Sequence, residues 1–177
     1  MKWCVAILLG TAVALAQSTA QSRNQRQAVP TVLISALSEV KAKSPIPVLL
    51  PSELPQPLVK VKYASVETAS ADKYAISLYY ELGVGDAGFA ASFMAEAHPS
   101  YGPKDIPNVS EVKLSHGIIG FFRPVSCGGS CAPANLWWEE DQTLYQVQLE
   151  LSSTLPEQDQ QREMISVADS AILAGAR

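Results

Sequence analysis

The sequence contains few of the residues on which catalytic and metal sites most often depend. Two histidines and three cysteines occur in 177 residues, and charged residues make up 17% of the chain. The 13 basic side chains are outnumbered by 17 acidic ones and form no polybasic stretch, which excludes a nucleic-acid binder and argues against binding to anionic lipid. An apolar fraction of 47% excludes a disordered chain, and the length suits one domain.

Long apolar runs are also scarce, and the one at the N-terminus is short. Lys2 precedes an apolar segment that reaches Ala16, and small residues at positions 14 and 16 and at positions 18 and 20 give two cleavage patterns. A positive start, about a dozen apolar residues and small residues at the exit are typical of a secretory signal peptide, whereas a membrane span needs about 20 apolar residues. The sequence therefore predicts a signal peptide at 1–20, a flexible arm at 21–30 and a single domain at 31–177. The mature protein is then secreted or periplasmic, without a membrane span.

Removal of the signal peptide leaves two cysteines, Cys127 and Cys131, with Gly-Gly-Ser between them. An oxidising compartment favours a disulfide for such a pair, and the two glycines permit a tight turn. A zinc site would need both thiolates together with His98 and His116, but the cysteine spacing is not the two-residue gap typical of zinc sites. The spacing also differs from the Cys-x-x-Cys of redox-active pairs. We expect a structural disulfide, no metal and no cofactor.

Helical periodicity occurs near both ends of the predicted domain. Residues 31–43 carry apolar side chains at helical spacing and end in lysines, which the helix dipole favours. Near the C-terminus, Thr154 and Glu157 have the spacing of a capping box. An apolar stripe from Met164 to Ile172 follows, and Gly175 is the expected end of this second helix.

Alternation of apolar and polar residues predicts strands between the two helices. Prolines flank 48–50, which suggests an edge strand, and His116-Gly117 and 140–142 are expected to form hairpin turns. The strands are expected at 48–50, 59–63, 74–82, 89–97, 111–115, 118–122, 135–139 and 143–151, the segment 89–97 also fitting a helix. The fold class is therefore α+β, a mostly antiparallel sheet of about six or seven strands with an N-terminal and a C-terminal helix packed on it.

The second half of the chain resembles a known group of proteins. The resemblance is carried by 112–122, by the loop from Cys127 to Cys131, by 138–147 and by 164–172, while 46–55 matches an early proline-flanked strand. The group consists of uncharacterised secreted bacterial proteins distantly similar to the DUF4367 class. The shared residues are turn, core and cysteine residues over most of 31–174, so the resemblance implies a fold and no activity. This chain lacks a second cysteine pair that the group carries at 83–88.

Candidates for catalysis are few. Ser130 is not in a Gly-x-Ser-x-Gly elbow, and a serine hydrolase would need His98 or His116 beside its nucleophile. The consecutive acids at 139–141 point alternately to opposite faces of a strand, so they form no facing carboxylate pair and are expected at a solvated hairpin tip. His116 takes the place of an asparagine in the group that the chain resembles, which favours a turn role. We assign no catalytic residue and keep as the alternative a small exported hydrolase that uses His98 or His116.

Aromatic residues give the candidate binding site. Trp137 and Trp138 are adjacent on a predicted strand, so one of them faces away from the core. The resemblance favours Trp138 as the core residue, which leaves Trp137 outward, and Tyr79 lies on the opposite face from Tyr74. Outward rings can stack on a sugar or a peptide unless the terminal helices cover that face, and the sequence leaves both arrangements open. The preferred prediction is an exported non-catalytic domain that binds a cell-envelope ligand or protein partner, either through this aromatic face with Trp137 and Tyr79 or through the glycine-rich loop at 83–88.

Overall fold

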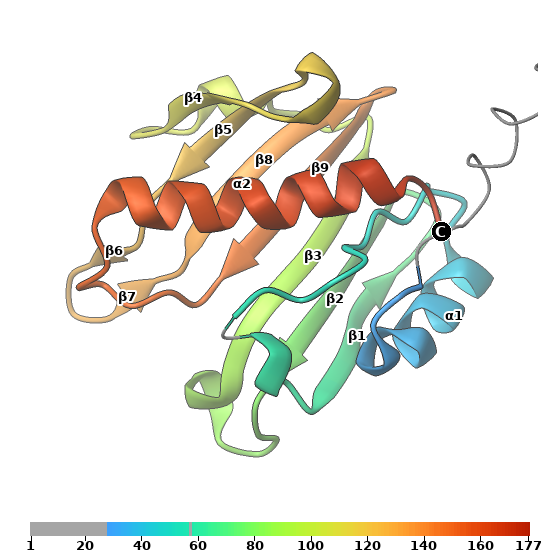
Figure 1. The fold of residues 1–177 in the computed structure, drawn as a ribbon. Coiled ribbons are helices and arrows are strands. Elements are labelled where there is room, and N and C mark those ends of the chain that lie inside the picture. Colours follow the sequence, from blue (N-terminus) through green and yellow to red (C-terminus); the bar gives the residue numbers. More distant parts are fainter. Residues whose placement is uncertain (1–27, 57) are drawn as a thin grey trace, which may run out of the picture.

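A computed structural model describes residues 28–56 and 58–177. The predicted signal peptide and most of the predicted arm lie outside the described residues. A seven-stranded antiparallel sheet with the order β1-β2-β3-β9-β8-β5-β4 forms the centre of the fold, with a helix at each end of the described chain (Figure 1). The predicted α+β fold and its number of strands are confirmed.

The strands of the large sheet are joined by loops and single helical turns, and β5 and β8 are joined by a small hairpin. They are β1 (Tyr63–Ala69), β2 (Lys73–Tyr79), β3 (Phe89–Ala97), β4 (Ser110–Lys113), β5 (Ile119–Arg123), β8 (Ala134–Glu140) and β9 (Thr143–Leu149). A separate small hairpin is formed by β6 (Ser126–Cys127) and β7 (Cys131–Ala132). The helices are α1 (Ile34–Lys43) and α2 (Glu157–Ala174), and the single turns are η1 (Thr31–Leu33), η2 (Leu58–Lys60), η3 (Gly85–Gly88), η4 (Pro103–Asp105) and η5 (Ser115–Gly117).

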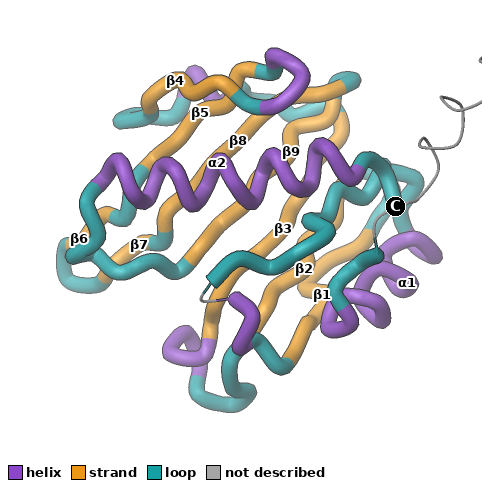
Figure 2. The backbone as a smooth tube through the Cα atoms, viewed as in Figure 1, coloured by secondary structure: helices purple, strands orange, loops and turns teal. Residues whose placement is uncertain are grey.

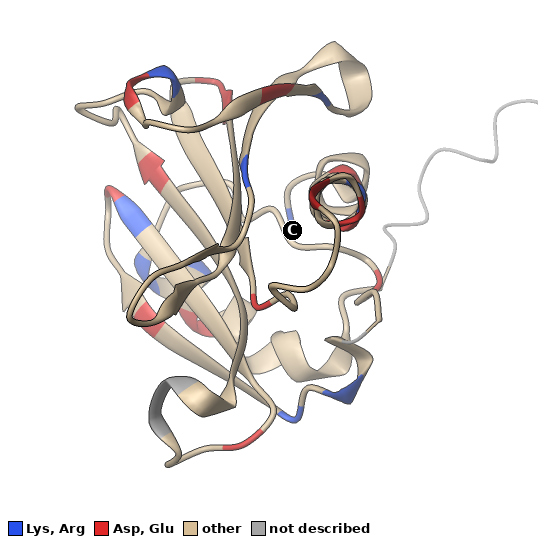
Figure 3. Cartoon of the chain, turned by 90° about the vertical axis from the view of Figure 1, so that its left-hand side faces the viewer, with Lys and Arg blue, Asp and Glu red and all other residues tan. Residues whose placement is uncertain are grey.

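Both helices lie on the same side of the sheet. Helix α2 crosses in front of β8 and β9, and α1 lies beside β1 (Figure 1). The extended segment 44–55, here called the strap, runs between the two helices across β2 and β3 (Figure 2). Seen nearly along its length, α2 stands on one side of the sheet (Figure 3). The sheet therefore has a face covered by the helices and the strap, and an opposite face that we call the open face.

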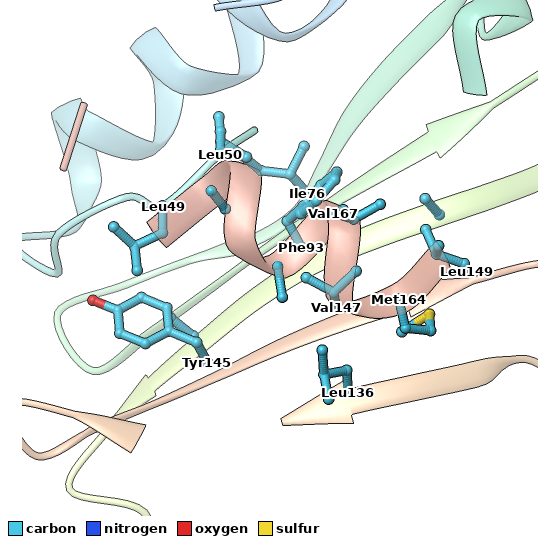
Figure 4. Packing of buried hydrophobic residues seen from close by; sticks show 14 of the residues in the cluster. Leu49, Leu50, Ile76, Phe93, Leu136, Tyr145, Val147, Leu149, Met164 and Val167 are labelled. Atoms are coloured by element: carbon cyan, nitrogen blue, oxygen red, sulfur yellow. The ribbon is translucent and has the colours of Figure 1, made fainter. Parts of the chain in front are cut away.

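The main core fills the space between the sheet and these covering elements. Alternate residues of each strand point into it, as the period of a strand requires, and α2 supplies a matching apolar stripe (Figure 4). Its largest fully buried side chains include Trp138, Tyr74, Phe93, Phe122, Leu50 and Met164. The inward orientation predicted for Tyr145, Val147, Leu149 and Leu151 is confirmed, since all four are buried in this core.

Three polar side chains of α2 attach the helix to the loops around it. Gln160 Oε1 accepts a hydrogen bond from Val125 N at 2.8 Å, and Asp169 Oδ1 accepts one from Ser115 N at 2.6 Å. Ser170 Oγ accepts one from Ser52 N in the strap at 3.2 Å. Backbone donors in loops need such partners once water is excluded. Helix α2 therefore fixes the positions of three loops as well as covering the core.

Two predicted strands are wrong. Residues 48–50 form only an isolated bridge between Leu49 and Ala176 and belong to the strap, and the predicted strand 59–63 is replaced by η2, with β1 starting at Tyr63. The nearby prolines donate no backbone hydrogen bond, so the strap joins no ladder of the sheet. Its apolar side chains at 48–50 are nevertheless buried, because the strap crosses the core face of the sheet.

The turns and helix ends agree with the sequence except at one cap. His116 and Gly117 have φ values of 59° and 76°, and Asp141 and Gln142 have 48° and 62°, as tight antiparallel hairpins require. Segment 89–97 is strand β3 rather than a helix, and Gly175 ends α2 with a φ of 70°. The predicted cap at Thr154 is wrong, because α2 begins after Pro156 and has no side-chain cap.

Candidate functional site

The open face presents one side chain from every second residue of each strand. One row across the sheet, in register, is Glu111, Phe121, Trp137, Gln146, Met94 and Ala75. The next row begins with Arg123, Asn135, Gln148, Ser92 and Ser77. In the described part of the chain both helices pack on the other face, so this surface is the place where a ligand can meet the sheet directly.

The two tryptophans lie on opposite faces, as the alternation predicts. Trp138 is 1% exposed and belongs to the main core, whereas Trp137 faces the open side. The expected exposure of Trp137 is wrong, because its ring is 4% exposed. The guanidinium carbon of Arg123, on the neighbouring strand, lies 5.1 Å from the ring centroid. Trp137, Phe121 and Leu144 are buried apolar residues outside the main core, so the open face has a small apolar cluster of its own.

Tyr79 also lies on the open face, at the end of β2, and is partly exposed. Its ring packs edge-on against Phe89, with the centroids 6.2 Å apart, and its hydroxyl donates to Glu67 Oε1 at 3.1 Å. Three strands, β3, β9 and β8, lie between β2 and β5 in the sheet order, so Tyr79 is far across the sheet from Arg123. The structure therefore does not bring Trp137 and Tyr79 together, and their binding roles stay predictions.

Between these aromatic groups lies a band of amide side chains that the sequence analysis did not single out. Asn135, 1% exposed, donates to Pro133 O at 2.8 Å. Its Oδ1 accepts from Gln146 Nε2 at 2.6 Å and from Gln148 Nε2 at 3.2 Å. Buried amides are stable only when their donors and acceptors are paired in this way. The band thus makes the centre of the open face rigid and polar.

A groove with a volume of about 600 Å³ opens on the open face near the β4 edge of the sheet. Its floor is apolar, formed mainly by Ile119 and Phe121 of β5. Its walls carry the carboxylates of Asp105, Glu111 and Glu139. The remaining lining residues are Gly102, Pro103, Lys104 and Ile118. Ile119 is 43% exposed, so an apolar surface is available to a ligand between the acidic walls.

The connection from β3 to β4 forms one wall of this groove. Because β3 is near the middle of the sheet and β4 is at its edge, residues 98–109 must pass β9, β8 and β5. A Cβ added to Gly102 would lie 3.6 Å from Glu139 Oε1, which places the connection over the open face. Residues with positive φ, His98 at 50° and Asn108 at 59°, turn the chain at its two ends. Tyr101, which is 47% exposed, lines a second hollow of about 160 Å³ above Met94 and Gln146.

The candidate catalytic residues have structural positions. His98 follows β3 and donates its backbone N–H to Gln142 O at 2.9 Å, while His116 forms the turn before β5, and both side chains are exposed. Ser130 lies in the exposed loop of the β6–β7 hairpin, which is on another part of the chain. Among the hydrogen bonds of the described residues, neither imidazole bonds a serine, so the structure assembles no triad around His98 or His116.

The predicted disulfide between Cys127 and Cys131 is present and closes the β6–β7 hairpin. Because the two sulfurs are bonded to each other, they are not thiolates that could hold zinc. Within residues 28–56 and 58–177, no three His, Cys, Asp or Glu side chains are grouped closely enough to bind a metal ion. The acidic walls of the groove are therefore spread around it rather than converging on one point.

The groove residues could not be found from the sequence, for a physical reason. The sequence predicts Glu139 at a solvated hairpin tip, and Glu139 is exposed, but Ile119 lines the same groove and the connection at Gly102 makes that tip a wall of it. Strand parity alone could have placed Glu111, Ile119 and Glu139 on one face. Parity does not show which strands are neighbours, and β5 and β8 are separated in the chain by the disulfide hairpin.

Comparison with protein-family models, curated proteins and solved structures gives no match. The resemblance to secreted proteins near the DUF4367 class thus stays a prediction. Over the described part of the chain, no helix is both long and apolar enough to cross a membrane.

Proposed function

We propose that the protein is an exported, non-catalytic domain that binds a cell-envelope ligand or protein partner through the open face of its sheet. The observation that carries this proposal is the asymmetry of the sheet. One face is filled by α1, α2 and the strap, while the other carries a groove, a second hollow and exposed apolar side chains. A surface with an apolar floor and polar walls is typical of a binding site.

Export is supported by two features of different kinds. The signal-peptide pattern at 1–20 directs the chain out of the cytoplasm, and a disulfide such as Cys127–Cys131 persists in an oxidising compartment. A ligand from the cell envelope follows from that location, because envelope glycans, lipids and proteins are what a periplasmic or secreted domain meets.

Truncation of one exposed apolar side chain in each hollow tests the proposal. The protein and its Ile119→Ser, Tyr101→Ser and Leu173→Ser variants are screened by thermal shift against glycans, peptidoglycan fragments, lipids and peptides. Leu173 is the matched control, because it is 60% exposed on α2, on the opposite side of the molecule. A ligand at about 100 times its dissociation constant stabilises the folded state by about 2.7 kcal/mol, which a thermal shift detects.

We expect at least one class to raise the melting temperature of the protein and of Leu173→Ser, and to raise it less in Ile119→Ser or Tyr101→Ser. The proposal is wrong if no class gives a shift, or if the shift is lost in Leu173→Ser and kept in both open-face variants. All three substitutions remove exposed apolar surface, so each can change the melting temperature of the protein without ligand. The shift caused by a ligand is therefore measured for each variant relative to the same variant without ligand.

A further inference from the structure

The groove beside η4 differs from the rest of the open face in its charge. Its lining contains three carboxylates, Asp105, Glu111 and Glu139, and one cation, Lys104. The ion pairs of the described residues are Lys43–Glu39 and Arg162–Asp159, so none of these four charges is neutralised by a salt bridge. Asp105 Oδ2 accepts a hydrogen bond from Gly102 N at 2.9 Å, while Glu111 and Glu139 are exposed on either side of the floor.

The sheet register fixes how far apart these two glutamates are. Glu111 pairs with Phe121 on one side of β5. On the other side Gly120 pairs with Trp138, and continuing this register by one residue places Glu139 opposite Ile119. Two strand spacings of about 4.8 Å and two residues of about 3.4 Å separate their Cα atoms, which gives a diagonal of about 12 Å. Among the described residues, no three His, Cys, Asp or Glu side chains are grouped closely enough to hold a metal ion, so the two glutamates are treated as separate charges on either side of the floor.

An extended peptide has the matching spacing. Side chains at positions i, i+2 and i+4 of an extended chain point to the same side, and positions i and i+4 are about 13 Å apart. Two basic residues at i and i+4 would therefore meet Glu111 and Glu139. The residue at i+2 would then lie over Ile119 and Phe121, the apolar floor between the two acids.

We propose that this groove binds an extended segment of a partner protein with a basic residue, an apolar residue and a second basic residue at alternate positions. The inference rests on the proposed function and adds the chemistry of the partner. Charge complementarity of this kind gives orientation and selectivity, and burial of the central apolar side chain gives affinity. Lys113 lies beside Ile119 at the sheet edge, outside the groove lining, and its charge opposes a basic ligand.

The test uses two blocked, dye-labelled peptides of the same composition. The first contains Lys-Thr-Leu-Thr-Lys, and the second contains Lys-Lys-Leu-Thr-Thr, in which the lysines are adjacent. Fluorescence anisotropy measures their dissociation constants for the protein and for three variants, Glu111→Gln with Glu139→Gln, Glu140→Gln and Lys113→Gln. Glu140 is the matched control, since it follows Glu139 on β8, is also exposed and points to the other side of the strand.

We expect the spaced peptide to bind about fivefold tighter than the adjacent-lysine peptide, because charge contacts at a partly exposed surface give an affinity advantage of about this size. The Glu111→Gln and Glu139→Gln double variant should lose that preference, Glu140→Gln should keep it, and Lys113→Gln should bind the spaced peptide more tightly. Addition of salt should weaken binding, because these contacts are screened.

Three results of the peptide measurements would overturn the inference. They are equal binding of the two peptides, an unchanged preference in the Glu111→Gln and Glu139→Gln double variant, or a loss of the same size in Glu140→Gln. A rise in melting temperature with calcium alone, abolished by the double variant, would make the groove a cation site and also overturn it. None of these results bears on the proposed function, which depends on the ligand panel and on Ile119→Ser and Tyr101→Ser.

Discussion

At the scale of single residues, the adjacent tryptophans have different surroundings. Trp138 stacks on Tyr145, with the ring centroids 5.5 Å apart, inside the main core, and Trp137 packs beneath Arg123 on the open face. We expect Trp138→Ala to lower the free energy of unfolding by about 3–5 kcal/mol, as deletion of a core aromatic does. Trp137→Ala should cost about 2 kcal/mol or more, because its ring is also buried.

Urea denaturation of the two variants measures these losses. A Trp137→Ala protein as stable as the parent would mean that the ring is exposed in solution, as the sequence alone predicted. The two outcomes differ in whether the Trp137 ring is buried. Arg123 lies over this ring in the structure, and no sequence pattern predicts that contact.

Two buried tyrosines make stability depend on alkaline pH. Burial raises the pKa of Tyr145 from 10.0 to about 12, with a further contribution from Glu140, and burial raises the pKa of Tyr74 as well. Since these hydroxyls lose their protons more readily in the unfolded chain, their contribution to stability is fully present below about pH 10. It is lost as the pH rises through the folded-state pKa, which for Tyr145 is about 12.

We therefore expect the melting temperature to fall between about pH 10 and pH 12, and to fall less steeply in Tyr145→Phe. The variant also loses the hydrogen bond that Tyr145 Oη donates to Pro47 O, so it should be less stable than the parent at neutral pH by about 1 kcal/mol. Identical pH profiles for the parent and for Tyr145→Phe would contradict the burial of this hydroxyl.

At the scale of elements, α2 stabilises loops that have no regular structure of their own. Gln160 is 4% exposed, and its Oε1 accepts a hydrogen bond from Val125 N. Val125 lies in the loop that leads into the disulfide hairpin. Gln160→Leu leaves that donor without its partner and should cost about 1–3 kcal/mol. Gln158→Leu, an exposed position on the same helix, should be nearly neutral.

Urea denaturation gives the two stabilities, and hydrogen exchange at Val125 gives the local effect. Faster exchange at Val125 in Gln160→Leu and unchanged exchange in Gln158→Leu is the expected pattern. Equal stability of the two variants would show that α2 covers the core without fixing this loop.

The disulfide is an element with a local role. Cys127 and Cys131 are both exposed and join two strands of two residues each. Closure of so short a loop contributes about 2 kcal/mol on the chain-entropy model. We expect Cys127→Ser with Cys131→Ser to lose at most this amount in urea denaturation and to retain the far-ultraviolet circular dichroism of the sheet. If the double variant lost the sheet signal at neutral pH, the disulfide would be required for the whole fold and not only for the hairpin.

Most regular elements could be predicted from the sequence, because their patterns are local. Strand β9 alternates between buried and polar residues, and the turns at His116 and Asp141 carry residues that tolerate positive φ. The strap could not be predicted, since 48–50 has the composition of a strand and its real partner is the core face of the sheet. The predicted cap at Thr154 is wrong because Pro156 takes the N-cap position and α2 begins at Glu157.

At the scale of the whole molecule, the sequence could not show which face of the sheet the helices cover. That choice depends on α2 packing against β8 and β9 and on the strap crossing β2 and β3, both contacts between distant parts of the chain (Figures 1 and 2). The groove depends on a third such approach, of the connection at Gly102 to β8, where a Cβ added to Gly102 would lie 3.6 Å from Glu139 Oε1. The scarcity of histidines and the aromatic residues on the strands predict a binding domain rather than an enzyme, and the strand order determines where the groove lies on the sheet.

Hydroxyl-radical footprinting tests the central claim most directly, because it reports the exposure of individual side chains. The protein is oxidised with and without the ligand that gives the largest thermal shift. We expect oxidation of Tyr101 or Ile119 on the open face to fall when the ligand is bound, while Leu173 and Ile34, which are 60% and 52% exposed on the helices, stay unchanged. Protection of Leu173 or Ile34 with no change at Tyr101 and Ile119 would contradict binding at the open face.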